Sequence, residues 1–301
     1  MFVWIVAVTI FIGNIAVIVT RVYLNERGLQ PLFIVSLVLS DILMGVYLVI
    51  IAYKNVKYMG EYFEHDEEWR SSISCTVAGV MSLLSSQVSL FIIAAITTER
   101  YCSIIYAVKN FATFSRKLKG LIVFSAWSIG CTISIIPAVY PRYFNSKEFL
   151  KFYGQNTVCL PLQLSDPDRE VLGWEYCLVL FGGVNTILCL YITSCYIAIY
   201  VSLRRNKDQI SSVRKRENSD LAKRMLGIVL TNLCCWFPII VFTFISLHGF
   251  HRSVNTLQAW TAVCLFPINS ALNPAIYTYF VSNIYHKLRN ALGLTNNNIL
   301  N

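Results

Sequence analysis

Long apolar runs separated by short polar segments fill the chain from its first residues to about position 281. Seven of these runs are about 20 residues or longer, which as helix matches the roughly 30 Å hydrocarbon core of a bilayer. The runs are approximately 2–23, 32–53, 75–98, 119–139, 174–203, 225–247 and 257–281. Because they use most of the chain, the pattern predicts an all-α membrane protein: one seven-transmembrane helix bundle forming a single domain over residues 1–301.

The polar segments change two of the expected helix ends. Helix is expected to continue from the third run to residue 106, and to begin at residue 222 ahead of the sixth. Beyond the seventh run, apolar residues recur at every fourth position (Phe280, Ile284, Leu288 and Leu292). This spacing predicts a short amphipathic eighth helix over about 282–292, lying on the membrane surface.

Composition supports a membrane protein and sets its orientation. The chain is 56% hydrophobic and 14% charged, far from the usual soluble composition. When the polar segments are assigned alternately to two sides, 17 of the 25 lysines and arginines fall on one side. That side is expected to be cytoplasmic, which places the N-terminus outside and the C-terminus inside. The net charge of +9 thus reflects topology and anionic lipid rather than nucleic-acid binding.

Two of the ten cysteines stand apart from the rest. Cys75 and Cys159 lie in polar sequence on the predicted extracellular side, where disulfides form, whereas the other eight lie in or at the ends of apolar runs. We therefore expect a Cys75–Cys159 bridge between the second outer loop and the third helix. The first run is too long for a cleaved signal peptide and is expected to act as its own insertion signal.

Charged residues within the membrane are costly and therefore suggest function. Asp41 falls near the middle of the second run, and Glu99 and Arg100 end the third. Simpler interpretations remain open: a neutral Asp41 bonded to a neighbouring helix, and an interfacial pair that reaches the lipid headgroups.

The sixth and seventh runs carry a second set of polar and helix-bending residues. Pro238 frees a backbone carbonyl and bends the sixth helix beside Trp236, although an aromatic that merely fills a kink gives the same sequence. Asn269 and Asn273 share one helix face because they are four positions apart. These amides are expected to face Asp41, Asn14 and Ser89 in the bundle.

Together these residues resemble the rhodopsin-like family of G-protein-coupled receptors over essentially the whole chain. The residues that carry the resemblance are Asn14, Asp41, Cys75 with Cys159, Glu99-Arg100-Tyr101, Trp127, Cys235-Trp236-Phe237-Pro238 and Asn273-Pro274-Ala275-Ile276-Tyr277. A narrower resemblance is to leucine-rich-repeat-containing receptors, especially relaxin receptors. It is carried by Phe152-Tyr153-Gly154, Val158-Cys159-Leu160-Pro161-Leu162, Ala222-Lys223-Arg224-Met225, Pro267 to Pro274, and a fifth run without proline.

The resemblance implies a receptor that transmits an extracellular agonist signal to a heterotrimeric G protein. Glu99 would hold Arg100 while the bundle is closed, and Tyr101, Asn273, Pro274 and Tyr277 would complete the switch around that arginine. Trp236 and Pro238 would form the hinge. A sodium ion would bind Asp41, Ser89, Asn269, Ser270 and Asn273 in the closed state, and no other cofactor is expected.

The resemblance also implies partners and a location. The agonist would be a peptide or protein hormone of the relaxin or glycoprotein-hormone type, and the receptor would lie in the plasma membrane. An alternative is an orphan receptor of the same family that binds a small peptide or small molecule directly in its bundle. Two departures are evident. These residues include no repeat-built ectodomain, so the chain is expected to be a fragment, an excised domain or a receptor that never had one. The acids near the sixth helix, Glu217 and Asp220, are not where a partner of Arg100 is expected.

Other classes fit less well. A transporter favours internal repeats, and none is evident. An opsin would need a lysine in the seventh run, and residues 257–281 contain none. An intramembrane enzyme would need several convergent groups, whereas Asp41 is the only acid at depth. His248 and His251 are spaced to bind zinc, although solvated loop histidines are far more common.

Overall fold

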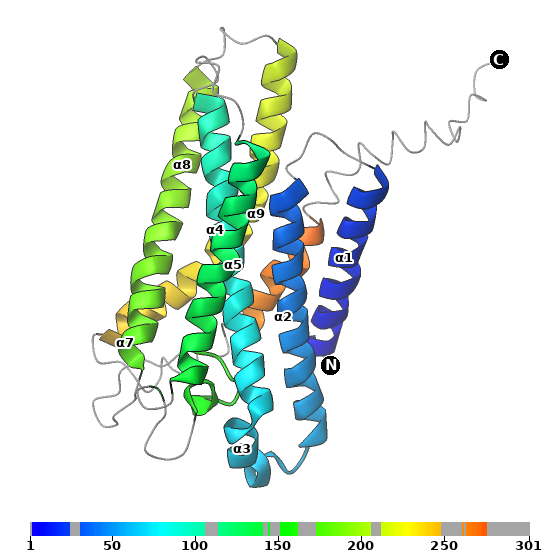
Figure 1. Cartoon of the computed structure of the whole chain (residues 1–301), viewed down its shortest axis with the longest axis vertical. Coiled ribbons are helices and arrows are strands. Elements are labelled where there is room, and N and C mark those ends of the chain that lie inside the picture. Colours follow the sequence, from blue (N-terminus) through cyan, green and yellow to red (C-terminus); the bar gives the residue numbers. More distant parts are fainter. Residues whose placement is uncertain are drawn as a thin grey trace, which may run out of the picture.

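The computed structural model describes residues 2–24, 31–105, 114–140, 144, 151–161, 173–205, 212–247, 261 and 263–275. Within these ranges the regular structure is helical and contains no strand. Six helices are long and apolar enough to cross a membrane. Figure 1 shows the long helices side by side along the longest axis of the molecule. The all-α fold class predicted from the sequence is therefore confirmed.

The helix bounds follow the predicted spans closely. The first four long helices are α1 (Phe2–Leu24), α2 (Pro31–Lys57), α4 (Ile73–Ile105) and α5 (Arg116–Val139). The fifth span consists of α7 (Trp174–Cys177), η3 (Leu178–Asn185) and α8 (Thr186–Arg205), and the sixth is α9 (Ser212–Leu247). Helix α9 begins ten residues before the expected position 222. Of the predicted seventh span, residues 263–275 are described and helical. The predicted eighth helix over 282–292 lies outside the described residues.

Helix α4 is the centre of the bundle. In its most apolar stretch 78% of the residues are buried, against 22% in α1 and in α5. It packs against α2, α5 and α8, so its small and polar residues face other helices rather than lipid. A helix surrounded in this way can relay displacements between its neighbours, and its two ends carry Cys75 and Arg100.

The outer end of the bundle is the end that carries α3 (Tyr62–Ser71), a short helix with many acidic residues that was not predicted from the sequence. In Figure 1, α3 lies at the lower end of the molecule, beyond the ends of α2 and α4. The opposite end, where α4 finishes and α5 begins, is the inner end. The charge pattern described above predicts that the outer end faces the extracellular side.

The fifth span has a π-helical segment that its sequence did not predict. Residues Leu178–Asn185 form η3, and the Thr186 hydroxyl donates to the Phe181 carbonyl five residues earlier at 3.1 Å. Such wide turns are rare and are often found at functional sites. Here the segment includes Gly182 and Gly183, whose missing side chains lower the preference for a regular α-helix.

A partly buried hydrogen bond links α5 to α2. The Trp127 indole nitrogen donates to the Ser36 hydroxyl at 2.9 Å. In lipid an indole N–H has no water to replace a lost partner, so such bonds hold helices in register.

We expect Ser36→Ala to lower the thermal unfolding temperature of the detergent-solubilised protein by about 2–5 °C, because the Trp127 N–H is left without an acceptor. Ser128→Ala is the matched control, since Ser128 is exposed on the same helix as Trp127. Equal unfolding temperatures for the two variants would contradict a structural role for this bond.

Candidate functional site

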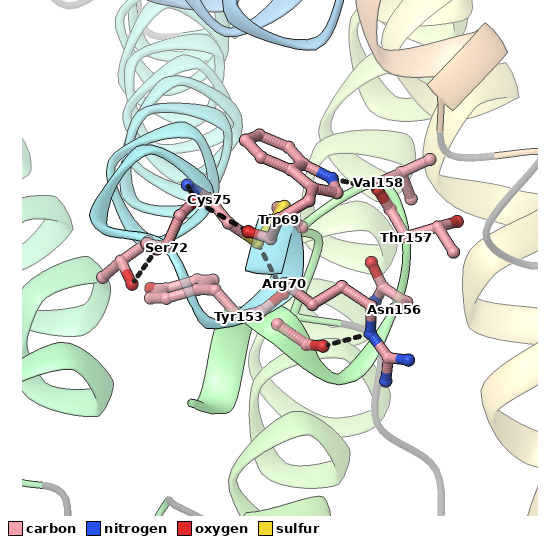
Figure 2. Close-up of a disulfide and its surroundings, with 12 residues drawn as sticks. Trp69, Arg70, Ser72, Cys75, Tyr153, Asn156, Thr157 and Val158 are labelled. Carbon is pink, nitrogen blue, oxygen red and sulfur yellow. Dashed lines mark hydrogen bonds between the residues drawn. A yellow bond between two sulfur atoms is a disulfide. The ribbon is translucent and has the colours of Figure 1, made fainter. Parts of the chain in front are cut away.

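A disulfide closes the outer end of the bundle. Cys75, near the start of α4, is bonded to Cys159, with Cα atoms 5.4 Å apart. The bond attaches the segment 151–161, here called the outer loop, which contains the short helix η2 (Phe152–Gln155). Figure 2 shows this disulfide, with residues of α3 reaching toward the same segment. The bridge predicted from the sequence is therefore present.

Helix α3 holds the outer loop through its backbone. The Trp69 indole donates to the Thr157 carbonyl at 2.9 Å, and Arg70 donates from Nε to the Gly154 carbonyl at 2.7 Å (Figure 2). A second Arg70 nitrogen reaches the Gln155 carbonyl at 3.2 Å, and a third forms an ion pair with Asp66 at 3.0 Å. Two adjacent side chains of α3 thus fix the backbone of the loop, which explains why this short helix is ordered.

The close approach of α3 and the loop requires glycine at two positions. A Cβ atom at Gly154 would lie 2.0 Å from the carbonyl oxygen of Arg70, and one at Gly79 would lie 2.2 Å from the Tyr153 ring. Tyr153 therefore packs flat on α4, and its hydroxyl donates to the Ser134 carbonyl of α5 at 2.6 Å. Burial raises the pKa of Tyr153 well above its usual value, so this phenol remains a donor.

The end of the outer loop turns inward. Cys159 has a positive φ of 55°, and the Asn156 side chain closes the turn by accepting from the Leu160 N–H at 2.8 Å and donating to the Leu160 carbonyl. From α2, the buried Tyr47 hydroxyl donates to the Val158 carbonyl at 3.0 Å. The loop is therefore fixed to α2, α3, α4 and α5 at once.

The turn closes a small cavity at the centre of the bundle. The cavity is lined by residues of α4, the outer loop, η3 and the seventh span: Ser82, Leu83, Ser86, Leu160, Pro161, Phe181 and Phe266. Leu160 and Pro161, at the end of the outer loop, thus form part of the cavity wall.

Aromatic side chains pack together beside this cavity. The Trp236 ring is buried between Phe181 and Phe266, with ring centroids 6.0 Å and 4.9 Å away. The neighbouring Cys235 thiol donates to the Leu265 carbonyl at 3.1 Å. Phe181 and Phe266 also line the cavity. Of the two proposed hinge residues, Trp236 thus packs against residues of the cavity wall, and Pro238 follows it in α9.

Deeper in the bundle, Asp41 lies in a polar cluster. The Asp41 carboxylate is fully buried and accepts a hydrogen bond from the Asn273 amide at 2.9 Å. The Ser270 hydroxyl also interacts with this carboxylate. The Asn14 amide donates to the carbonyls of Ile10 and Ser270. Helices α1 and α2 therefore meet the seventh span here through polar groups.

Several oxygens in and around this cluster have no hydrogen-bond partner. They are Asp41 Oδ1, Ser89 Oγ, Asn269 Oδ1 and Asn273 Oδ1, all buried. An unpaired buried oxygen is costly, whereas a carboxylate with amide and hydroxyl oxygens is the donor set that a hard cation prefers. The residues present therefore fit a sodium ion.

At the inner end of α4, Glu99 and Arg100 turn to different neighbours. The buried Glu99 carboxylate forms an ion pair with Lys119 of α5 at 2.9 Å, and no ion pair with Arg100 is present among the described residues. Arg100 interacts electrostatically with Tyr196 of α8 and with Glu99, and its Nε has no hydrogen-bond partner. This arrangement differs from the expectation that Glu99 holds Arg100, because adjacent helical residues project about 100° apart.

The remaining predicted residues are less fully defined. Tyr277, His248 and His251 lie outside the described residues, as do the side chains of Glu217 and Asp220. Tyr101 is half-buried near Ile104 and Ile199. Sequence reasoning missed Lys119, Tyr196, Tyr47 and the role of Trp69 and Arg70. Only the Trp69-Arg70 pair just ahead of Cys75 gave any indication, since both residues can donate hydrogen bonds to a loop.

Comparison with known proteins agrees with this arrangement. The sequence model of the family described as "7 transmembrane receptor (rhodopsin family)" matches residues 13–277. G-protein coupled receptor GRL101 of Lymnaea stagnalis is 35% identical over 278 residues, which are 92% of this chain and 24% of that protein. Relaxin receptor 1 of Mus musculus is 34% identical over 92% of this chain and 36% of its own length. Relaxin receptor 2 of Homo sapiens is 31% identical over 97% and 38%.

The chain thus spans between 24% and 38% of the length of these relatives. The family match covers the polar cluster around Asp41, the disulfide and the inner end of α4, and the relatives match nearly the whole of this chain. The proteins of the matching family are signalling receptors and not enzymes. The chain therefore belongs to the rhodopsin family of seven-transmembrane receptors, and it is similar to relaxin receptors over nearly its whole length.

Proposed function

We propose that this chain is the membrane domain of a receptor that couples an extracellular peptide or protein hormone to a heterotrimeric G protein. The observation that carries the proposal is the course of α4, which runs from the disulfide beneath the outer loop to the half-buried Arg100 at the inner end. A displacement at one end of this central helix reaches the other through packed neighbours. The receptor lies in the plasma membrane, with its N-terminus outside and its C-terminus in the cytoplasm.

A peptide or protein agonist is favoured over a small molecule that binds within the bundle. Leu160 and Pro161 of the outer loop line the small central cavity, and the disulfide holds this loop in place, so a ligand that needs more room inside the bundle would have to displace a disulfide-bonded segment. A hormone acting from outside could instead move α3 and the loop together. Relatives named as receptors for relaxin, and one named as a probable glycoprotein hormone receptor from Anthopleura elegantissima, support this class of agonist.

The mechanism is a two-state equilibrium of the bundle. A hormone outside and a G protein inside each bind the open state more tightly, so each increases the affinity for the other. Movement of the outer loop reaches Trp236 through Phe181 and Phe266, which line the cavity and contact the Trp236 ring. Pro238 lies in the same helix as Trp236 and provides the bend. Opening at the inner end then exposes Arg100 to the G protein.

The polar cluster around Asp41 stabilises the closed state. A sodium ion held by Asp41, Ser89, Asn269, Ser270 and Asn273 would supply the charge that the unpaired oxygens lack. Asp41 itself stays fixed by the Asn273 amide. Because these residues come from α2, α4 and the seventh span, holding them together opposes the separation of those helices.

Arg100 is tested by nucleotide exchange. In lipid nanodiscs with purified heterotrimeric G proteins, we expect Arg100→Ala to lower agonist-independent exchange about tenfold or more, because the G protein loses a charged contact. Asp41→Asn should also change the exchange rate, because it alters the stability of the closed state. Arg116→Ala, at an exposed position on α5, is the control. Unchanged exchange in both Arg100→Ala and Asp41→Asn would refute the assignment.

Removal of sodium provides an independent test. At a sodium concentration about ten times the dissociation constant, the folded protein gains about 1.4 kcal/mol, so its unfolding temperature should be a few degrees higher in sodium chloride than in choline chloride. Asp41→Asn should abolish this difference. A difference of equal size in both proteins would exclude Asp41 as a ligand.

The outer loop is tested without any agonist. Arg70→Ala removes two hydrogen bonds to the loop backbone, so amide hydrogen exchange in residues 152–161 should become about tenfold faster. Glu64→Ala, at an exposed position of α3, should leave it unchanged. Equal protection in both variants would show that α3 does not hold the loop.

A further inference from the structure

The inner end of α4 separates two charges that are adjacent in sequence. The Glu99 carboxylate faces α5, where Lys119 Nζ lies 2.9 Å from its Oε1, whereas Arg100 forms no ion pair with Glu99 in the described part of the chain and interacts electrostatically with Glu99 and with Tyr196 of α8. Adjacent residues of a helix cannot share one direction. The two side chains are therefore directed to different helices, each of which packs against α4.

Glu99 depends on a cation more than most carboxylates do. Its side chain is 1% exposed, and neither of its oxygens has a hydrogen bond of good geometry. A buried carboxylate without compensation is strongly unfavourable. In the described part of the chain its ion pair is with Lys119, whose side chain is 16% exposed and so almost as dry.

Arg100 is the alternative cation. It is the next residue along α4, it already acts on Glu99 electrostatically, and its Nε has no hydrogen-bond partner. If Lys119 were neutral, Glu99 would need another positive group, and the Arg100 guanidinium, which already interacts with Glu99 electrostatically, is the candidate in the described part of the chain. The two cations therefore compete for one carboxylate.

We propose that Lys119 is a positioning residue that holds Glu99 away from Arg100 and so keeps the guanidinium available to the G protein. This inference rests on the proposed function. It assigns α5 a part in setting basal activity, because the charge that frees Arg100 comes from the first turn of that helix. Loss of Lys119 should therefore lower activity, even though Lys119 itself need not touch the G protein.

The pairing is tested by double-mutant cycles on the unfolding temperature of the purified receptor. Lys119→Gln and Glu99→Gln should be strongly non-additive, because either change removes the same ion pair. Arg100→Gln and Glu99→Gln should be nearly additive. Coupling of Glu99 with Arg100 but not with Lys119 would overturn the proposal, and this measurement needs no G protein.

The consequence is tested by agonist-independent nucleotide exchange in nanodiscs, with purified heterotrimeric G proteins as the probe. We expect Lys119→Gln to lower exchange about fivefold, within the usual range of coupling between sites. Lys119→Arg should restore it. Lys117→Gln removes the same charge from an exposed position on the same helix and should leave exchange unchanged.

A third comparison separates positioning from folding. In a Glu99→Gln background, Lys119→Gln should have no further effect on exchange, since no carboxylate remains to capture Arg100. An effect as large as in the wild type would overturn the proposal, as would equal exchange in Lys119→Gln and Lys117→Gln. Absence of exchange in the wild type would instead overturn the proposed function, and this role with it, while the unfolding cycles would still show whether the ion pair exists.

Discussion

The Asp41 carboxylate has no contact with solvent, and the bundle around it is arranged accordingly. In lipid, each polar group needs its hydrogen-bond partners within the protein. Asp41 accordingly accepts a hydrogen bond from the Asn273 amide of the seventh span at 2.9 Å. Asn14 of α1 is linked to the same place through the Ser270 carbonyl. These bonds run between helices that are far apart in sequence, so the centre of the bundle is specified by polar contacts as much as by packing.

This constraint also explains the division of the molecule along its length. The outer end is held by a covalent bond from the loop to α4 and by hydrogen bonds between the loop and α2, α3 and α5. The middle contains buried oxygens without hydrogen-bond partners, which are costly. The inner end holds the buried Glu99 carboxylate beside two cations, Lys119 and Arg100.

The sequence predicted the fold well because lipid imposes a simple rule on composition. Apolar runs of helical length located the spans to within a few residues at most ends, and the polar setting of Cys75 and Cys159 indicated their bridge. The earlier start of α9 was missed because residues 212–221 are polar and leave no trace in an apolar pattern. The π-helical turn in η3 was missed because Gly182 and Gly183 permit it without requiring it.

The candidate site was predicted in its members rather than in its contacts. Asp41, Asn273 and Ser270 could be grouped because buried polar groups need hydrogen-bond partners within the protein, whatever the detailed geometry. The partner of Glu99 could not be found in this way, because Lys119 stands among other basic residues at a membrane surface, where lysines are expected. The role of the outer loop depends on backbone carbonyls, and these have no signature in the sequence.

The covalent attachment of the outer loop has a consequence for biosynthesis. Cys75 and Cys159 are 84 positions apart, so the loop can be fastened only after two further spans have been inserted and the intervening chain has been translocated. That step requires an oxidising lumen. Completion of the outer surface is therefore a late event of maturation, and in molecules with free thiols only hydrogen bonds and packing would hold the outer loop to the bundle.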